Sequence, residues 1–370
     1  RYTQSRSSAA SDVYKRQAPL NQGIFALGSH PLTSARAAKD MMKALKSEDG
    51  LNRLIAEMRA HPDYNRAIAS GLEVHSTRLG RGEEFFTSDL LNNLPIISHS
   101  ERAYTAYLNK LRMDMFANLV KAQEKPMFGG LVKGKRLTID QLKQTAEFVN
   151  TVTGVGTGGA AGALKKLNQH TGLMFAPGYW VSRIKTVSGT PAINALAKGN
   201  PRLAGLIVAD YAKVIGTVGA GLYALKSQGY DVDLNPTSGK FGIVSKDGVE
   251  WDPTGGLLGP WRFAMKATQE QDGRKPNIPV AAGYYGTGKA SPLLRYFIAA
   301  LSKESFGKNT DPATLEGQKN LFMGLMPIQV QQQLEIPRDS RLSDTEKAAI
   351  RILTLLGGNV NVKEQPSKRS

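Results

Sequence analysis

Cysteine is absent from the 370-residue sequence. This absence excludes disulfides, thiolate metal sites and cysteine nucleophiles. Histidine is scarce too, and its five positions show neither an HExxH motif nor any other metal-ligand spacing. Aromatic residues make up only 7% of the chain while glycine is abundant, which favours closely packed helices over a β-sandwich. We therefore expect no metal, no cofactor and no thiol chemistry.

Acidic residues are few compared with basic ones. The chain has 48 lysines and arginines against 31 aspartates and glutamates, a formal net charge of +17. A basic excess of this size favours polyanionic partners, namely nucleic acid, anionic lipid or an acidic protein. It does not decide among them.

The N-terminal stretch Ser7–Gln17, "SSAASDVYKRQ", lacks the apolar region and the cleavage site of a signal peptide. All eleven of its residues resemble the in-frame translation of a sequencing-library adapter. We therefore interpret residues 1–17 as non-native and disordered. They contain four cations and one acid, so the rest of the chain keeps +14 of the net charge.

Hydrophobic periodicity predicts a mainly α fold, a multi-helix bundle with one small β-hairpin insertion at about 240–252. The hairpin is predicted from "GKFGIVSKDGVEWD", in which Asp247-Gly248 is a favoured turn pair. We expect an N-terminal helical region over 18–130 and a helical domain over 131–358 that contains the hairpin and a glycine-rich loop. A polar basic tail is expected over 359–370.

The strongest helical pattern lies between residues 98 and 125, where one apolar stripe recurs every three or four residues. We expect this stripe to face the core. Its members are Tyr104, Leu108, Leu111, Met115, Leu119 and Ala122.

A second long helix is predicted over Leu203–Leu225, with small residues spaced by fours from Ala212 to Ala224. It is long enough to cross a bilayer. However, Asp210, Lys213 and Thr217 share one face, and charges in a lone membrane span are costly. A buried bundle helix is the favoured interpretation, and membrane insertion is the alternative.

Six separated blocks of the sequence are "SERAYTAYLNKLRMDMF", "FVNTVTG", "LMFAPGYWVSRI", "DLNPTSGKFG", "WDPTGGLLGPWRFA" and "LLRYFIAALSK". In this order they resemble a region near the C-terminus of very large multi-domain (polyvalent) proteins of tailed phages and prophages. The resemblance covers about residues 83–358, and the blocks contain no catalytic motif. It implies an internal virion protein or one injected with the phage DNA.

Two glycine-rich motifs suggest nucleotide sites. "GVGTGG" at Gly154–Gly159 fits G-x-G-x-x-G, but a helix is predicted before it and no acidic residue lies between Glu147 and Asp210. We interpret it as a joint between helices. In "GYYGTGKAS", Gly283, Gly288 and Lys289 fit a phosphate-binding loop, but Ala290 stands where a hydroxyl should hold Mg²⁺. A mobile surface loop is the favoured interpretation there, and a nucleotide hydrolase is the alternative.

Clusters of cations are the candidates for nucleic-acid binding, and a solvated basic surface is the equal alternative. No motif for reading base sequence accompanies them. "APGYWVSRIK" also mixes aromatic residues with cations, although its Tyr179 and Trp180 are better explained as core residues. The candidate residues are Lys133, Lys135, Arg136, Lys165, Lys166, Arg183 and Lys185, with Lys198 and Arg202 as a further pair.

The sequence therefore predicts a non-enzymatic structural or interaction module of a phage virion. We expect it to bind DNA or a partner protein through a basic surface, in the virion or in the host cytoplasm after injection. The first alternative is a membrane-active module of a DNA-ejection protein that uses the Leu203–Leu225 helix. The second is a nucleotide hydrolase at residues 283–291. No small-molecule substrate is identified.

Overall fold

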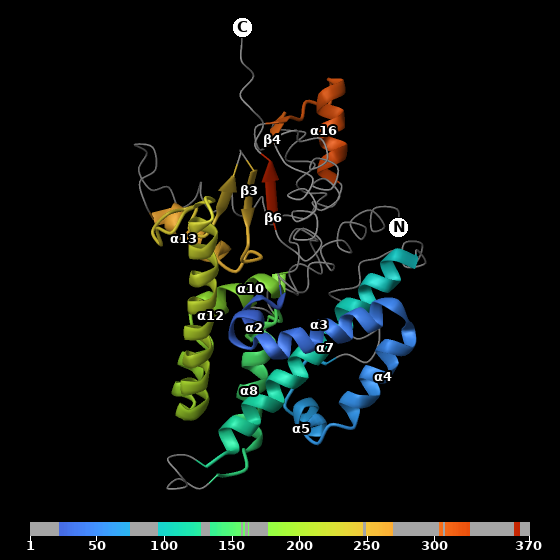
Figure 1. Cartoon of the computed structure of the whole chain (residues 1–370), viewed down its shortest axis with the longest axis vertical. Helices are drawn as coiled ribbons and strands as arrows, with labels where there is room; N and C mark the ends of the chain where they lie inside the picture. The colour runs from blue at the N-terminus through green and yellow to red at the C-terminus, as the bar shows by residue number, and fades with distance from the viewer. Residues whose placement is uncertain are drawn as a thin grey trace.

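The structure is a computed structural model of the whole chain (Figure 1). It describes residues 22–74, 95–126, 134–156, 158–159, 162, 177–246, 249–268, 303–305, 308–325 and 359–362. The predicted Asp247-Gly248 turn lies outside these residues, although the strands on either side of it are described.

The described residues are mainly helical, which confirms the predicted fold class. The N-terminal helices are α2 (Ile24–Ser29), α3 (Pro31–Lys46), α4 (Glu48–Arg59), α5 (Tyr64–Ala69) and α7 (Pro95–Glu124). The middle of the chain forms α8 (Ile139–Val152), α10 (Pro177–Val187), α11 (Thr190–Ala197) and α12 (Pro201–Ser227). Two further helices are α13 (Gly259–Thr268) and α16 (Leu315–Leu325).

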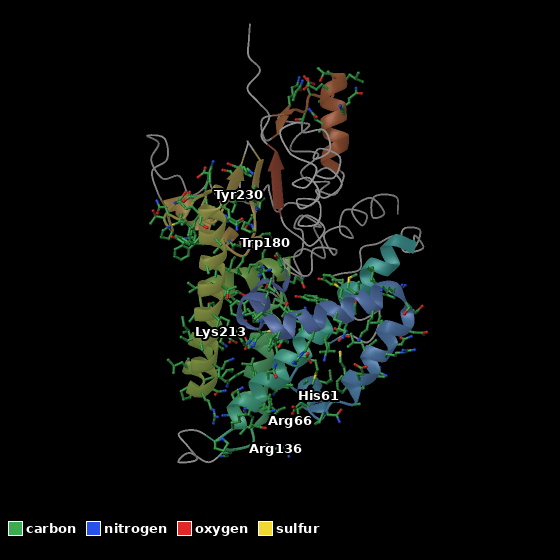
Figure 2. All side chains as sticks on the ribbon, in the orientation of Figure 1. His61, Arg66, Arg136, Trp180, Lys213 and Tyr230 are labelled. Carbon is green, nitrogen blue, oxygen red and sulfur yellow. The ribbon has the colours of Figure 1, made fainter. Side chains whose placement is uncertain are left out.

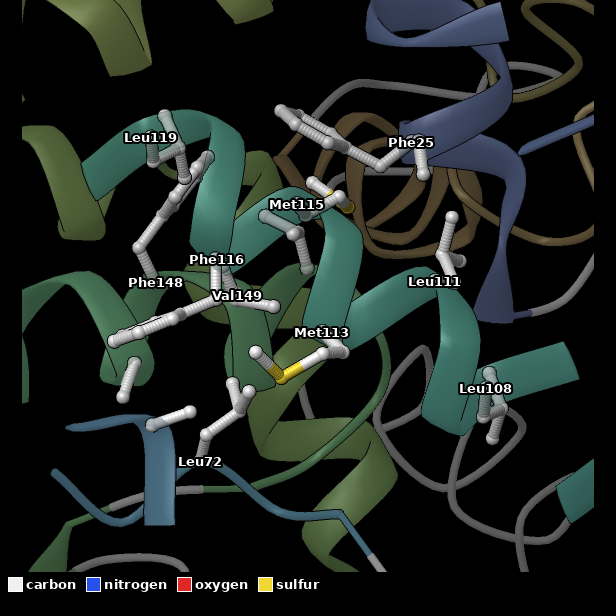
Figure 3. Packing of buried hydrophobic residues seen from close by; sticks show 14 of the residues in the cluster. Phe25, Leu72, Leu108, Leu111, Met113, Met115, Phe116, Leu119, Phe148 and Val149 are labelled. Carbon is white, nitrogen blue, oxygen red and sulfur yellow. The ribbon is translucent and has the colours of Figure 1, made fainter. Parts of the chain in front are cut away.

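Helix α7 forms the centre of the main hydrophobic core. Its predicted apolar stripe faces inward, with Leu111 and Met115 completely buried, because α3 packs along one side of the helix and α8 packs against another (Figure 3). The same core takes residues from Ile24 in α2 to Leu257. This core therefore takes residues from both sides of residue 130.

The predicted hairpin is present as β2 (Val244–Lys246) paired with β3 (Val249–Asp252). It belongs to a larger antiparallel sheet in the order β1-β2-β3-β6, with β1 at Asp231–Val232 and β6 at Asn359–Val362. The predicted basic tail therefore begins with an edge strand. A separate pair, β4 (Glu304–Ser305) and β5 (Lys308–Asn309), also forms.

The sheet leans on the C-terminal end of α12 (Figure 1). Val232 in β1 and Val244 in β2 are buried against Leu222 of the helix. A two-stranded hairpin alone is only marginally stable in water, so this contact and the two additional strands explain why the hairpin forms.

Helix α12 differs from the predicted buried bundle helix, because many of its residues are exposed and a carboxylate, that of Asp210, lies among the buried ones. The Asp210 carboxylate is buried, 2.8 Å from His30 Nε2 and 2.8 Å from the Lys213 amine. The Thr217 hydroxyl donates a hydrogen bond to the Gly28 carbonyl at 3.1 Å. Asp210 and Thr217 thus contact the C-terminal part of α2 and His30, which follows it, while several large apolar side chains of α12 stay at the surface.

Candidate polyanion-binding surface

Four helix ends meet at one end of the molecule: the C-termini of α7 and α11 and the N-termini of α8 and α12. Hydrogen bonds between these segments establish the arrangement, and Figure 2 shows Arg66 and Arg136 in this region. We call the cations gathered here the basic end. Its residues are Lys121, Lys125, Lys135, Arg136, Lys143, Lys198 and Arg202.

A buried polar network joins three of these helices. The Asn200 side chain caps α12 by accepting the Leu203 amide, and its amide group donates to Gln123 Oε1 at 3.3 Å. Gln123 in turn donates to Thr145 Oγ1 of α8 at 2.9 Å. Because buried polar groups are costly to separate from their partners, this network fixes the relative positions of the helix ends.

Arg202 continues the same connection at the surface. Its Nη2 donates to the Ala122 carbonyl at 2.8 Å and to the Lys125 carbonyl, which are among the last carbonyls of α7 and its C-terminus. A cation at this position also compensates the negative end of the α7 dipole. Arg202 therefore brings the N-terminus of α12 against the C-terminus of α7.

The segment that carries Lys135 and Arg136 is held against the end of α7. A Cβ atom at Gly134 would lie 2.2 Å from the Glu124 carbonyl oxygen, so only glycine permits this approach. Glu124 accepts the Leu137 amide at 2.9 Å and pairs with Arg66. Burial raises the pKa of Glu124, but its hydrogen bonds from Arg66 and Leu137 outweigh that effect and hold the pKa below its usual value.

The charge of the basic end is largely uncompensated. Five of its seven residues, all except Lys143 and Lys198, form no ion pair with a described carboxylate. The pair between Lys143 and Asp140 spans 3.9 Å with both side chains exposed, so it contributes little. The N-termini of α8 and α12 add positive dipole ends, although Asp140 in the first turn of α8 offsets part of the first. The surface therefore attracts anions.

The amino acids predicted to bind nucleic acid do not all lie on one surface of the structure. Lys135 and Arg136 are exposed and belong to the basic end. Lys133, Lys165 and Lys166 lie outside the described residues. Lys185 is only partly exposed and lies 3.8 Å from the Glu147 carboxylate.

The prediction that Arg183 belongs to a basic surface is wrong, because its side chain is 1% exposed. The guanidinium turns back along α10, and Nε donates to the Tyr179 hydroxyl at 2.9 Å. Tyr179 and Trp180 pack edge to face, with ring centroids 5.5 Å apart, and each is half-buried.

Lys121, Lys125 and Lys143 were not predicted from the sequence. Lys121 and Lys125 are isolated cations in the last turn of a helix and just beyond it, so no cluster marks them along the chain. A usable signal was their position at a helix C-terminus, where cations are favoured.

The two glycine motifs have separate outcomes. "GVGTGG" follows helix α8, as predicted, and begins directly after Thr153, the last residue of that helix's C-terminal cap. A dinucleotide site requires a strand before this motif, whereas the structure has a helix there. The other motif, with Gly283, Gly288 and Lys289, lies outside the described residues.

Among the described helices, α12 is the one long and apolar enough to cross a membrane by length and composition. Only 28% of its most apolar window is buried. Comparisons with models of protein families, with curated proteins and with solved structures find no match.

Proposed function

We propose that the protein is a non-enzymatic interaction module that binds a polyanion through the basic end, and that the polyanion is DNA. The observation that carries the proposal is the convergence of seven cations and two helix N-termini on one surface. In the setting that the sequence resemblance implies, the DNA is that of a phage, bound by an internal or injected virion protein.

Two further features support DNA rather than a small anion. The cations come from four helix ends, so they are spread over a surface instead of converging on one point. The polar network of Asn200, Gln123 and Thr145 holds these ends in place before binding. Lysines and arginines arranged in this way contact successive phosphates without reading the base sequence.

Removing four exposed cations of the basic end is expected to lower the affinity for duplex DNA at least about tenfold. Each lost phosphate contact also reduces the slope of log affinity against log salt concentration by about one. The variant is Lys121→Ala, Lys125→Ala, Lys135→Ala and Arg136→Ala combined. Fluorescence anisotropy with a labelled duplex, measured across a salt series, gives both quantities.

The matched control removes four exposed cations from α3 and α4, so the net charge changes equally. It should keep most of the affinity and of the salt slope. An equal loss in both variants would mean that net charge alone drives binding, and a wild-type protein that does not bind DNA at low salt would refute the proposal. The control substitutions are Arg36→Ala, Lys39→Ala, Lys46→Ala and Arg53→Ala.

A second candidate function is contact with a lipid bilayer through α12. Its outward side carries Val208, Ile215 and Tyr223, which are 59%, 71% and 68% exposed. Gly216 and Gly219 lie between them in the sequence, and a Cβ added at either would meet no described neighbour within 4 Å. Exposed apolar area of this kind favours an apolar environment, because burial stabilises each large side chain by about 1.5–3 kcal/mol.

Replacing Ile215 and Tyr223 with aspartate is expected to reduce flotation with anionic phospholipid vesicles at least about tenfold in high salt. High salt removes binding that depends on the basic end alone. Leu32→Asp is the control, since Leu32 is 74% exposed and belongs to α3. Flotation that disappears in salt for the wild-type protein would count against lipid contact.

A further inference from the structure

Arg183 is a buried cation with an incomplete set of hydrogen bonds. Its Nε donates to Tyr179 Oη at 2.9 Å, and Cζ lies 4.9 Å from the centroid of the Tyr179 ring. Nη1 and Nη2 are buried, and neither has a hydrogen-bond partner among the described residues. Most of the donors of this guanidinium are therefore unsatisfied.

An unsatisfied guanidinium is costly inside a protein. Arginine keeps its proton at any physiological pH, so it cannot relieve the cost by becoming neutral. A buried donor without an acceptor costs about 1–3 kcal/mol, and more when the group is charged. Arg112, the other arginine as deeply buried among the described residues, shows the contrast, because Nε, Nη1 and Nη2 all donate to oxygen atoms of Thr153 and Glu73.

Among the described residues, no carboxylate forms an ion pair with Arg183. Between Glu147 and Asp210 the sequence has six lysines and arginines and no acidic residue. Glu147 itself pairs with Lys185 and Lys198, and Asp210 pairs with His30 and Lys213. An anion from outside this segment is needed.

The position of Arg183 suits such an anion. Its side chain points back toward the first turn of α10, an 11-residue helix, where the helix dipole is positive. The chain after α8 passes close to this turn, since a Cβ at Gly156 would lie 2.4 Å from the Gly178 carbonyl oxygen. The Lys185 amine lies 3.3 Å from where a Cβ at Gly158 would stand.

We propose that Nη1 and Nη2 of Arg183 hold a phosphate-class oxyanion at the N-terminal turn of α10. The two terminal nitrogens of a guanidinium match two oxygens of a phosphate in a bidentate pair. Free inorganic phosphate and the phosphate group of a nucleotide share this chemistry. The site is separate from the basic end and does not depend on the proposed DNA binding.

The test measures the midpoint of thermal unfolding in sodium phosphate and in sodium chloride of equal ionic strength. Phosphate is expected to raise the midpoint of the wild-type protein by about 2–4 °C in a saturable way, because ligand binding to the folded state stabilises it. In Arg183→Met this saturable increase should disappear. Arg136→Ala, which alters the basic end, should keep the full increase.

Phosphate also stabilises proteins generally, without saturation, and this effect is common to all the variants. The same saturable shift in Arg183→Met as in the wild-type protein, or no shift above chloride in the wild-type protein, would overturn the proposal. Arg183→Lys retains the charge but loses the bidentate fork, so the phosphate concentration at half-saturation should rise about tenfold. This variant keeps the test valid if Arg183→Met does not fold.

A parallel series with adenosine monophosphate distinguishes the two sources. Saturation at a lower concentration than that of inorganic phosphate identifies a nucleotide as the ligand. Saturation by inorganic phosphate with no response to the nucleotide identifies the free ion. Both results support the site, provided that they require Arg183, and the absence of both responses refutes it.

Discussion

Replacing Arg112 with methionine is expected to lower the free energy of unfolding by about 3–5 kcal/mol, because three buried hydrogen bonds are lost. Arg112 is 2% exposed in the middle of α7. Its Nε donates to Thr153 Oγ1 at 2.9 Å, Nη1 to the Glu73 carbonyl at 2.9 Å and Nη2 to the Thr153 carbonyl at 3.2 Å. Methionine fills similar space but leaves these buried acceptors without donors.

The effect is large because Arg112 connects three parts of the bundle. Thr153 ends α8, and Glu73 follows α5 in a segment that Asn150 also holds, by accepting the Glu73 amide at 3.0 Å. Urea unfolding followed by circular dichroism measures the change. Arg53→Met, at an exposed arginine of α4, is the control and should change stability by less than about 0.5 kcal/mol. A loss below about 1 kcal/mol for Arg112→Met would contradict the prediction.

Replacing Phe148 with alanine is expected to lower the free energy of unfolding by about 3–5 kcal/mol as well. The ring is 1% exposed and meets Phe25 edge to face, with centroids 6.0 Å apart (Figure 3). Phe25 in turn meets Tyr211, at 5.0 Å. These three rings join α8, α2 and α12, so the cavity would open where helices from distant parts of the sequence meet.

Guanidinium unfolding of Phe148→Ala and of Ile193→Ala tests this prediction. Ile193 is 64% exposed, so its truncation leaves no cavity and should have little effect. Small domains are stable by only about 5–15 kcal/mol, so the loss at Phe148 would be a large part of the total. Equal midpoints for Phe148→Ala and the wild-type protein would show that the three-ring contact does not hold the bundle together.

Tyr211 also contributes a polar contact at this position. Burial raises the pKa of its hydroxyl well above the usual value, so the group stays protonated at neutral pH. It donates to the Thr186 carbonyl at the end of α10, at 2.5 Å. The contact between α12 and α10 therefore does not vary with pH through this side chain.

Short-range sequence patterns predicted those helices and strands that are encoded by neighbouring residues. The apolar stripe from Tyr104 to Ala122 predicted a core-facing helix, since its three- and four-residue spacing requires one buried side. The pairing of β2 and β3 followed from a favoured turn between two short apolar runs. The pairing of β3 with β6 joins Trp251 to Val360, more than a hundred residues apart, and no local pattern encodes such a partner.

The candidate surface was only partly predictable for the same reason. Lys135 and Arg136 form a visible cluster in the sequence, whereas Lys121 and Lys125 become their neighbours only after Arg202 and Glu124 bring helix ends together. Arg183 lies in a basic stretch that suggests a surface position, but its side chain is buried. A sequence shows which residues are charged, and packing decides which of them reach solvent.

By itself the sequence determined the absence of thiol chemistry, the excess of positive charge and the mainly helical class with its hairpin. The tertiary structure alone decided that α12 buries Asp210 and exposes large apolar residues, that Arg183 is buried and that cations gather where four helices end. The physical reason is that periodicity and composition define the chemistry of a helix face. Which face is covered depends on the partners, such as His30 for Asp210, that distant parts of the chain provide.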